Sequence, residues 1–146
     1  MTNKKNLMFI VAFLVVIGGY IIISRSTGVS GDLSFMHDRI SVNGDSRVAF
    51  SIAMEDVKSC TLRDDWDMGA PVSGDKKGRT CYGIWKNDEV GEYHIWGDSK
   101  IRYWVAVQTK DGGYYVFNTE SDETTQILHE SLHNYFNELG LTVEGG

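Results

Sequence analysis

The chain has 146 residues, of which 42% are hydrophobic and 12% aromatic, so its composition suits one packed domain rather than a disordered segment. All 20 acidic residues but only 12 of the 14 basic residues follow Ile23, which gives the part of the chain after this residue a net charge of −8. Nucleic acids and anionic lipid headgroups are both bound through basic surfaces. This charge therefore argues against nucleic acid as a partner and does not indicate lipid headgroup binding.

An uncharged apolar run, Leu7–Ile23, follows a short basic tail at residues 1–6. A helix of this length rises about 25 Å, near the lower limit for crossing the core of a bilayer. We predict a single-pass transmembrane anchor at residues 7–24, with a cleaved signal peptide and a buried hydrophobic helix as the alternatives. The run ends in Ile21-Ile22-Ile23-Ser24-Arg25, without the small residues of a cleavage site, and this favours the anchor.

The charges that flank the anchor bear on its orientation. Lys4 and Lys5 precede it, whereas Arg25 and Arg39 are the basic residues that follow soon after it. The positive-inside bias weakly favours a cytoplasmic N-terminus. We therefore predict a protein of the cell membrane whose domain lies outside the cytoplasm, with a linker at residues 25–31, the domain at 32–140 and a tail at 141–146.

Alternating apolar and polar residues predict a series of short strands in the domain. Tight turns are expected at Asn43-Gly44 and Asp111-Gly112, because these dipeptides favour hairpins. Arg63–Gly78 is predicted to be a long loop whose Trp66 covers the sheet. The predicted strands, joined in antiparallel fashion, span residues 33–35, 39–42, 47–52, 57–62, 80–85, 92–96, 101–107 and 114–117.

One amphipathic helix is predicted at the end of the domain. Ser121 is a suitable N-cap, Asp122 and Glu123 complement the helix dipole, and Gly140 is placed to end the helix. A single apolar stripe would pack against the sheet. The stripe consists of Ile127, Leu128, Ser131, Leu132, Tyr135 and Leu139. The fold class is thus α+β, with seven or eight short strands and one C-terminal helix.

The helix contains the motif H-E-x-x-H at His129, Glu130 and His133, in which two histidines one turn apart can bind zinc and the glutamate can activate water. These three residues are the candidate metal and catalytic residues of the chain. Against this role, the apolar stripe places His129 about 100° and His133 about 140° from its centre, toward the flank or the solvent. No third ligand follows at the local spacing, so we expect a surface helix, no cofactor and no enzyme, with incidental metal binding and a zinc hydrolase as the alternatives.

Two further pairs of residues are candidates for a specific role. Cys60 and Cys81 could form a disulfide if the domain is outside the cell, or could be two small buried hydrophobic residues. Trp66 and Trp85 could form an exposed aromatic contact for a protein partner.

The segment GRTCYGIWKNDEVGEYHIW and the later WVAVQTKDGGYYVFNTESDETTQILHESL resemble the bacterial pleckstrin-homology-like (PH-like) domains of small membrane proteins. The elements that match are Arg79-Thr80, Gly83 and Gly91, the turn Thr109-Lys110-Asp111-Gly112, and Phe117-Asn118. The segment MEDVKSCTL also resembles the start of a strand in that family. Members of the family often have two membrane helices, whereas this chain has one apolar run.

The resemblance implies a PH-like barrel or roll at about residues 33–139, with no enzymatic activity and no known ligand. We therefore expect a membrane-anchored binding or assembly module that contacts a protein partner. A zinc hydrolase and an acidic domain that binds through exposed aromatic residues are the alternatives.

Overall fold

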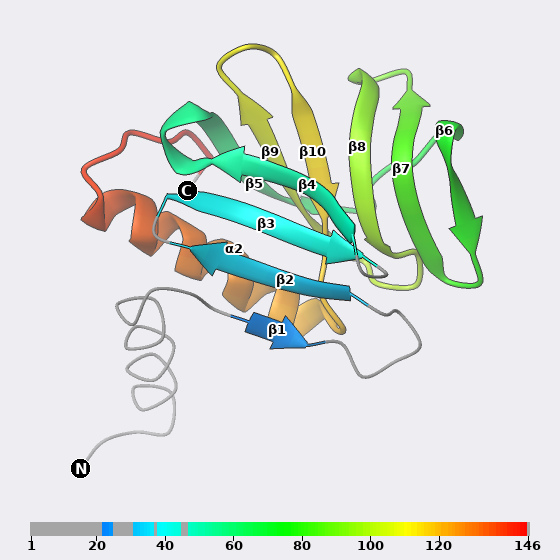
Figure 1. Cartoon of the computed structure of the whole chain (residues 1–146), viewed down its shortest axis with the longest axis horizontal. Coiled ribbons are helices and arrows are strands. Elements are labelled where there is room, and N and C mark those ends of the chain that lie inside the picture. Colours follow the sequence, from blue (N-terminus) through cyan, green and yellow to red (C-terminus); the bar gives the residue numbers. More distant parts are fainter. Residues whose placement is uncertain (1–21, 25–30, 37, 45–46, 146) are drawn as a thin grey trace.

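The computed structural model describes residues 22–24, 31–36, 38–44 and 47–145 (Figure 1). Most of the predicted anchor and linker therefore lies outside the described residues. The last residues of the predicted anchor form a short strand, β1 (Ile22–Ser24). Within the described ranges, no helix has both the length and the apolar character needed to cross a membrane.

The first sheet is an antiparallel meander of four strands in the order β1-β2-β3-β4. Its other members are β2 (Gly31–Met36), β3 (Arg39–Gly44) and β4 (Arg47–Ala53). Alternating residues of β3 and β4 are buried on one face, which is the pattern of a sheet with one solvated side. These buried residues are Ile40, Val42, Phe50 and Ile52.

A short 3-10 helix, η1 (Met54–Asp56), leads from β4 into the second sheet. This sheet has six strands in the order β5-β9-β10-β8-β7-β6. Its strands are β5 (Val57–Asp64), β6 (Ala70–Lys77), β7 (Thr80–Asn87), β8 (Gly91–Asp98), β9 (Tyr103–Thr109) and β10 (Tyr114–Phe117).

The prediction of purely antiparallel connections is wrong at one place in this sheet. Strand β10 lies between β9 and β8 and runs parallel to β8, with Tyr115 opposite His94 and Phe117 opposite Trp96. The turn at Asp111-Gly112 pairs β10 with β9 as predicted, but the strand on its other side is not its neighbour in sequence. Local patterns predict hairpins and carry no information about such an insertion.

The predicted loop at residues 63–78 contains strand β6, which pairs with β7 at the edge of the sheet. All of its residues are exposed except the half-buried Gly74. Pro71 is tolerated here because an edge strand does not need every backbone N–H, and the register shifts next to it, between Pro71 and Ser73. An exposed edge strand has no buried face, so no alternating pattern marks it in the sequence.

Helix α2 (Asp122–Glu138) begins and ends as predicted. The Ser121 hydroxyl accepts a hydrogen bond from the Thr124 N–H, and the Thr124 hydroxyl accepts one from the Ser121 N–H, which completes a capping box. At the other end Gly140 has φ +70°, and the Leu141 N–H donates to the Phe136 carbonyl at 2.9 Å. This is a Schellman motif, which needs a residue in the left-handed conformation after the helix.

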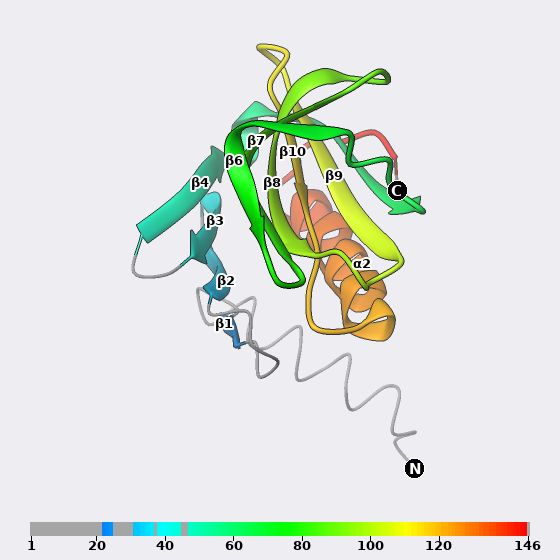
Figure 2. The ribbon, with the colours of Figure 1, turned by 90° about the vertical axis from the view of Figure 1, so that its right-hand side faces the viewer.

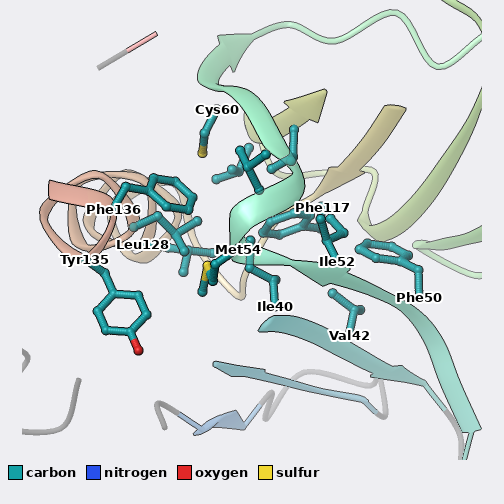
Figure 3. Close-up of a cluster of buried hydrophobic side chains, with 14 of the residues drawn as sticks. Ile40, Val42, Phe50, Ile52, Met54, Cys60, Phe117, Leu128, Tyr135 and Phe136 are labelled. Carbon is teal, nitrogen blue, oxygen red and sulfur yellow. The ribbon is translucent and has the colours of Figure 1, made fainter. Parts of the chain in front are cut away.

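The helix lies along one side of the six-stranded sheet, against β9 and β5 (Figure 2). We call the core on this side the helix-side core (Figure 3). Besides the four residues of the first sheet, it contains Met54, Val57, Cys60, Trp96, Val105, Val107, Phe117, Leu128, Leu132, Tyr135 and Phe136. Leu141 and Val143 of the predicted tail pack against it, so the C-terminal residues belong to the domain.

The other side of the six-stranded sheet carries a second core, which we call the aromatic core. The segment at residues 65–69, between β5 and β6, covers it with Trp66 and Met68. The Trp66 ring stacks on Tyr114 and meets Tyr93 edge to face. The prediction that Trp66 covers the sheet is confirmed. The members of this core are Trp66, Cys81, Trp85, Tyr93, Ile95, Trp104, Ala106 and Val116.

Candidate functional site

The two histidines of the H-E-x-x-H motif lie on the flank of α2 that faces the edge strand β5. The buried residues of the helix are Thr125, Leu128, Leu132, Tyr135 and Phe136. At 100° per residue, the centre of this set is about 70° from His129, closer than the predicted stripe implied. The buried face includes Phe136 and excludes Leu139, which is 44% exposed. The centre of this face therefore lies closer to both histidines than predicted, and both side chains lie nearer to the sheet.

Both imidazole rings converge on one backbone atom of β5. The Nε2–H of His133 donates to the Cys60 carbonyl oxygen at 2.6 Å, and the Nε2–H of His129 donates to the same oxygen at 3.2 Å. His129 also lies 3.3 Å from the Gly145 carbonyl oxygen. Each ring is half-buried, and burial lowers the pKa of His129 below its usual value.

The Cys60 side chain lies beside the two histidines, a contact that was not predicted from the sequence. Its thiol is fully buried in the helix-side core, and desolvation raises its pKa to about 12. The sulfur, one ring nitrogen of His129 and one ring nitrogen of His133 all lie within 4.8 Å of one another. We call these three residues the Cys-His cluster.

A β-bulge determines which way Cys60 points. The register of β5 against β9 shifts between Val57 and Ser59, so that Val57 and Cys60 are both buried in the helix-side core. In a regular strand these two residues, three positions apart, would face opposite sides of the sheet. The bulge therefore brings a thiol to the helix without removing Val57 from the core.

An open hollow of about 360 Å³ lies over the Cys-His cluster. It is lined by Leu62 of β5 and by residues of one face of α2, namely Gln126, His129, Glu130, His133 and Asn134. Glu130 is exposed at this surface. The predicted candidates His129, Glu130 and His133 thus share one surface, with Cys60 behind the two rings.

The disulfide considered for Cys60 and Cys81 does not exist in this structure, in which both cysteines are free and buried. Cys60 belongs to the helix-side core and Cys81 to the aromatic core. The strands that carry them, β5 and β7, are separated by three others. The alternative, two small buried hydrophobic residues, describes both positions.

The expectation that Trp66 and Trp85 form an exposed contact for a partner is wrong. Their side chains are only 6% and 5% exposed, because both belong to the aromatic core. The guanidinium of Arg63 lies 4.9 Å from the centre of the Trp66 ring and pairs with Glu89 at 2.7 Å, which further covers this tryptophan.

Three of the residues that carry the resemblance to PH-like domains have structural roles. Arg79 forms an ion pair with the buried Asp98 at 2.8 Å. The Asn118 side chain accepts from the Asp98 N–H at 2.8 Å and donates to the Asp98 carbonyl at 3.0 Å, which joins β10 to β8. Gly83 has φ +90°, and a Cβ atom there would lie 2.5 Å from the Gly74 Cα. Gly83 is therefore required where β6 and β7 approach closely.

Comparison of the chain with protein-family models, with curated protein sequences and with solved structures gives no match.

Proposed function

We propose that the chain is a membrane-anchored PH-like domain that acts as a binding or assembly module without catalytic activity. The observation that carries this proposal is the architecture, a largely antiparallel arrangement of sheets with one capped C-terminal helix packed across it. Three motif residues of the resemblance support it, because Arg79 and Asn118 bond to Asp98 of β8 and Gly83 permits the close approach of β6 to β7. The parallel pairing of β10 with β8 is a departure from an all-antiparallel barrel.

The partner of this module is proposed to be a protein. The net charge of −8 after Ile23 disfavours nucleic acid and anionic lipid headgroups. The predicted anchor at residues 7–24, the last three of which form strand β1, would hold the domain at the cell membrane, with the domain outside the cytoplasm.

Membrane fractionation of cells that make the full chain tests the anchor. We expect the chain to stay with the membranes after a wash at high salt and alkaline pH. The variant Val15→Lys, which places a charge near the middle of the apolar run, should move to the soluble fraction. Recovery of the unsubstituted chain in the soluble fraction would contradict the proposal.

Labelling with a membrane-impermeant thiol reagent tests the orientation of the domain. Neither natural cysteine is suitable, because both are buried. Lys77→Cys introduces a thiol at the exposed end of β6. Labelling of this variant in intact cells is expected for a domain outside the cytoplasm, and labelling only after lysis would place it inside. A photo-crosslinker at the same position then tests for a protein partner, and the absence of any crosslinked protein would count against a binding module that uses this edge.

The zinc hydrolase remains the alternative function, since the structure adds Cys60 to the two histidines of the motif. It requires hydrolytic activity that is lost together with zinc in His129→Ala.

A further inference from the structure

We infer that Cys60, His129 and His133 form a binding site for a zinc ion where α2 meets β5. The zinc site goes beyond the proposed function, because a binding module without catalytic activity does not require a metal ion. It depends on the position of three side chains in the described domain and not on the membrane anchor or the partner.

The donor atoms are of the types that zinc prefers, one thiolate sulfur and two imidazole nitrogens. Zinc sites of this kind have Zn–S distances of about 2.3 Å and Zn–N distances of about 2.0–2.1 Å, so neighbouring donors lie roughly 3.3–3.7 Å apart. In the Cys-His cluster all donors lie within 4.8 Å of one another. Side-chain rotations that bring the donors closer and turn both Nε2 atoms away from the Cys60 carbonyl oxygen would form the site.

The helix keeps the two imidazoles in place. His129 and His133 are four residues apart, so they project from the same face of α2. The Nε2 atoms of His129 and His133 lie near each other, because both are hydrogen-bonded to the Cys60 carbonyl oxygen, at 3.2 and 2.6 Å respectively. The capping box at Ser121 and the Schellman motif at Gly140 fix both ends of the helix that carries them. The ligands are thus held together before any ion arrives, which lowers the cost of binding.

Zinc binding replaces contacts that each ligand makes in the free protein. The S–H bond of Cys60 breaks, its sulfur forms a bond to zinc, and the proton passes to the solvent. In each neutral imidazole the N–H moves from Nε2 to Nδ1, and the Nε2 lone pair then coordinates the ion. One proton is therefore released for each zinc bound.

The fourth coordination position would face the hollow above the cluster. Both histidines line this hollow, whereas the Cys60 thiol is fully buried behind them. A zinc ion with three protein ligands commonly holds a water molecule at the open position. Glu130 at the same surface is available to bind that water or to offset the positive charge of the ion.

Titration of the full chain with zinc in detergent, without a polyhistidine tag, tests the site. We expect one zinc per chain by elemental analysis after gel filtration, release of one proton per zinc, and a higher melting temperature with zinc. Cobalt should give the absorption band of a thiolate-to-cobalt charge transfer. His129→Ala and His133→Ala should each weaken zinc binding by more than the ~10–100-fold that is typical when a residue outside the ligand set is changed.

Matched controls are available within the same domain. Cys81→Ala removes the other buried thiol, and His94→Gln removes a half-buried histidine that stacks on Tyr115 of the sheet. Both variants should bind zinc as the unsubstituted chain does, whereas Cys60→Ala should lose the thiolate-to-cobalt band. If Cys60→Ala fails to fold, the two histidine variants and the cobalt spectrum of the unsubstituted chain decide the matter.

Three results would overturn the inference. They are the absence of stoichiometric zinc in the unsubstituted chain, equal zinc binding by the histidine variants and the controls, and a cobalt complex without the thiolate band.

Discussion

The two faces of the six-stranded sheet are buried by different means. On one face, helix α2 and the first sheet cover a core that is mainly aliphatic, with Phe50, Trp96, Phe117, Tyr135 and Phe136 as its aromatic members. On the other, the short segment at residues 65–69 covers a core that includes three tryptophans. The small cover is sufficient because each large ring buries much apolar area.

The difference between the faces explains why the histidine side chains of α2 lie beside one core and not beside the other. A helix packed on a sheet edge presents side chains at fixed spacing beside the buried stripe, as His129 and His133 show. The segment at residues 65–69 contributes its Trp66 and Met68 side chains as packing. The two cysteines illustrate the contrast, because Cys60 lies beside the two rings, whereas the Cys81 thiol donates to the Met68 sulfur at 3.5 Å.

The strongest test of this comparison is Phe117→Ala on the helix side. Phe117 is fully buried in the strand between β9 and β8, where little can move to fill the cavity. We expect the free energy of unfolding to fall by about 3–5 kcal/mol. Urea denaturation followed by circular dichroism measures the change, and a loss below about 1 kcal/mol would show that this core is loosely packed.

Trp66→Ala tests the aromatic face. The expected loss is about 3 kcal/mol, at the lower end of the range for such substitutions, because a connecting segment can shift more easily than a central strand. Exposure of the aromatic core should appear as increased binding of a hydrophobic dye. An effect larger than that of Phe117→Ala would reverse the comparison between the two faces.

Tyr93→Phe sharpens the comparison through pH. The Tyr93 hydroxyl donates to the Met68 carbonyl at 2.6 Å, so its removal should cost about 1 kcal/mol at neutral pH. Burial raises the pKa of Tyr93 from 10.0 to about 12. Because the unfolded chain loses this proton first, the contribution of the group to stability is complete below pH 10 and is lost as the pH rises to about 12.

The difference between Tyr93→Phe and the unsubstituted chain should therefore shrink above pH 10. Denaturant titrations at several alkaline pH values measure it. Tyr82→Phe, at the 38% exposed Tyr82, serves as the control. A constant difference from pH 8 to about 12 would contradict the burial of the Tyr93 hydroxyl.

Val72→Thr should have the smallest effect, a change in unfolding free energy within about 0.5 kcal/mol. Val72 is 53% exposed on the edge strand β6 and belongs to neither core. A loss of more than about 1 kcal/mol in the same denaturation assay would contradict the assignment of Val72 to neither core.

Most elements of the fold were predicted from the sequence because their signals are local. Tyr114–Phe117 forms β10 with the bounds predicted, and Ser121 and Gly140 flank the helix as expected. These assignments depend on alternation, turn dipeptides and capping residues, which act over a few positions. Strand β6 was missed because an exposed edge strand shows none of these signals.

The candidate site was predicted only in part. The helical spacing of His129 and His133 was visible in the sequence, but their orientation depended on Phe136 joining the buried face. Cys60 could not be connected to them, because it is 69 residues from His129 and its direction depends on a bulge in β5. An apolar pattern that includes both Val57 and Cys60 was the available signal for that bulge.

The position of β10 also has a consequence for how the chain folds. Strands β8 and β9 follow each other in sequence, yet β10 lies between them and bonds to both. A direct hairpin of β8 with β9 would have to open before β10 could enter. We therefore expect the β9–β10 hairpin to form first and then to dock on β8, a contact between more distant segments. Because α2 follows β10 directly, docking of this hairpin also brings the helix to the sheet. We therefore expect the hairpin and the helix to pack in one slow cooperative folding step.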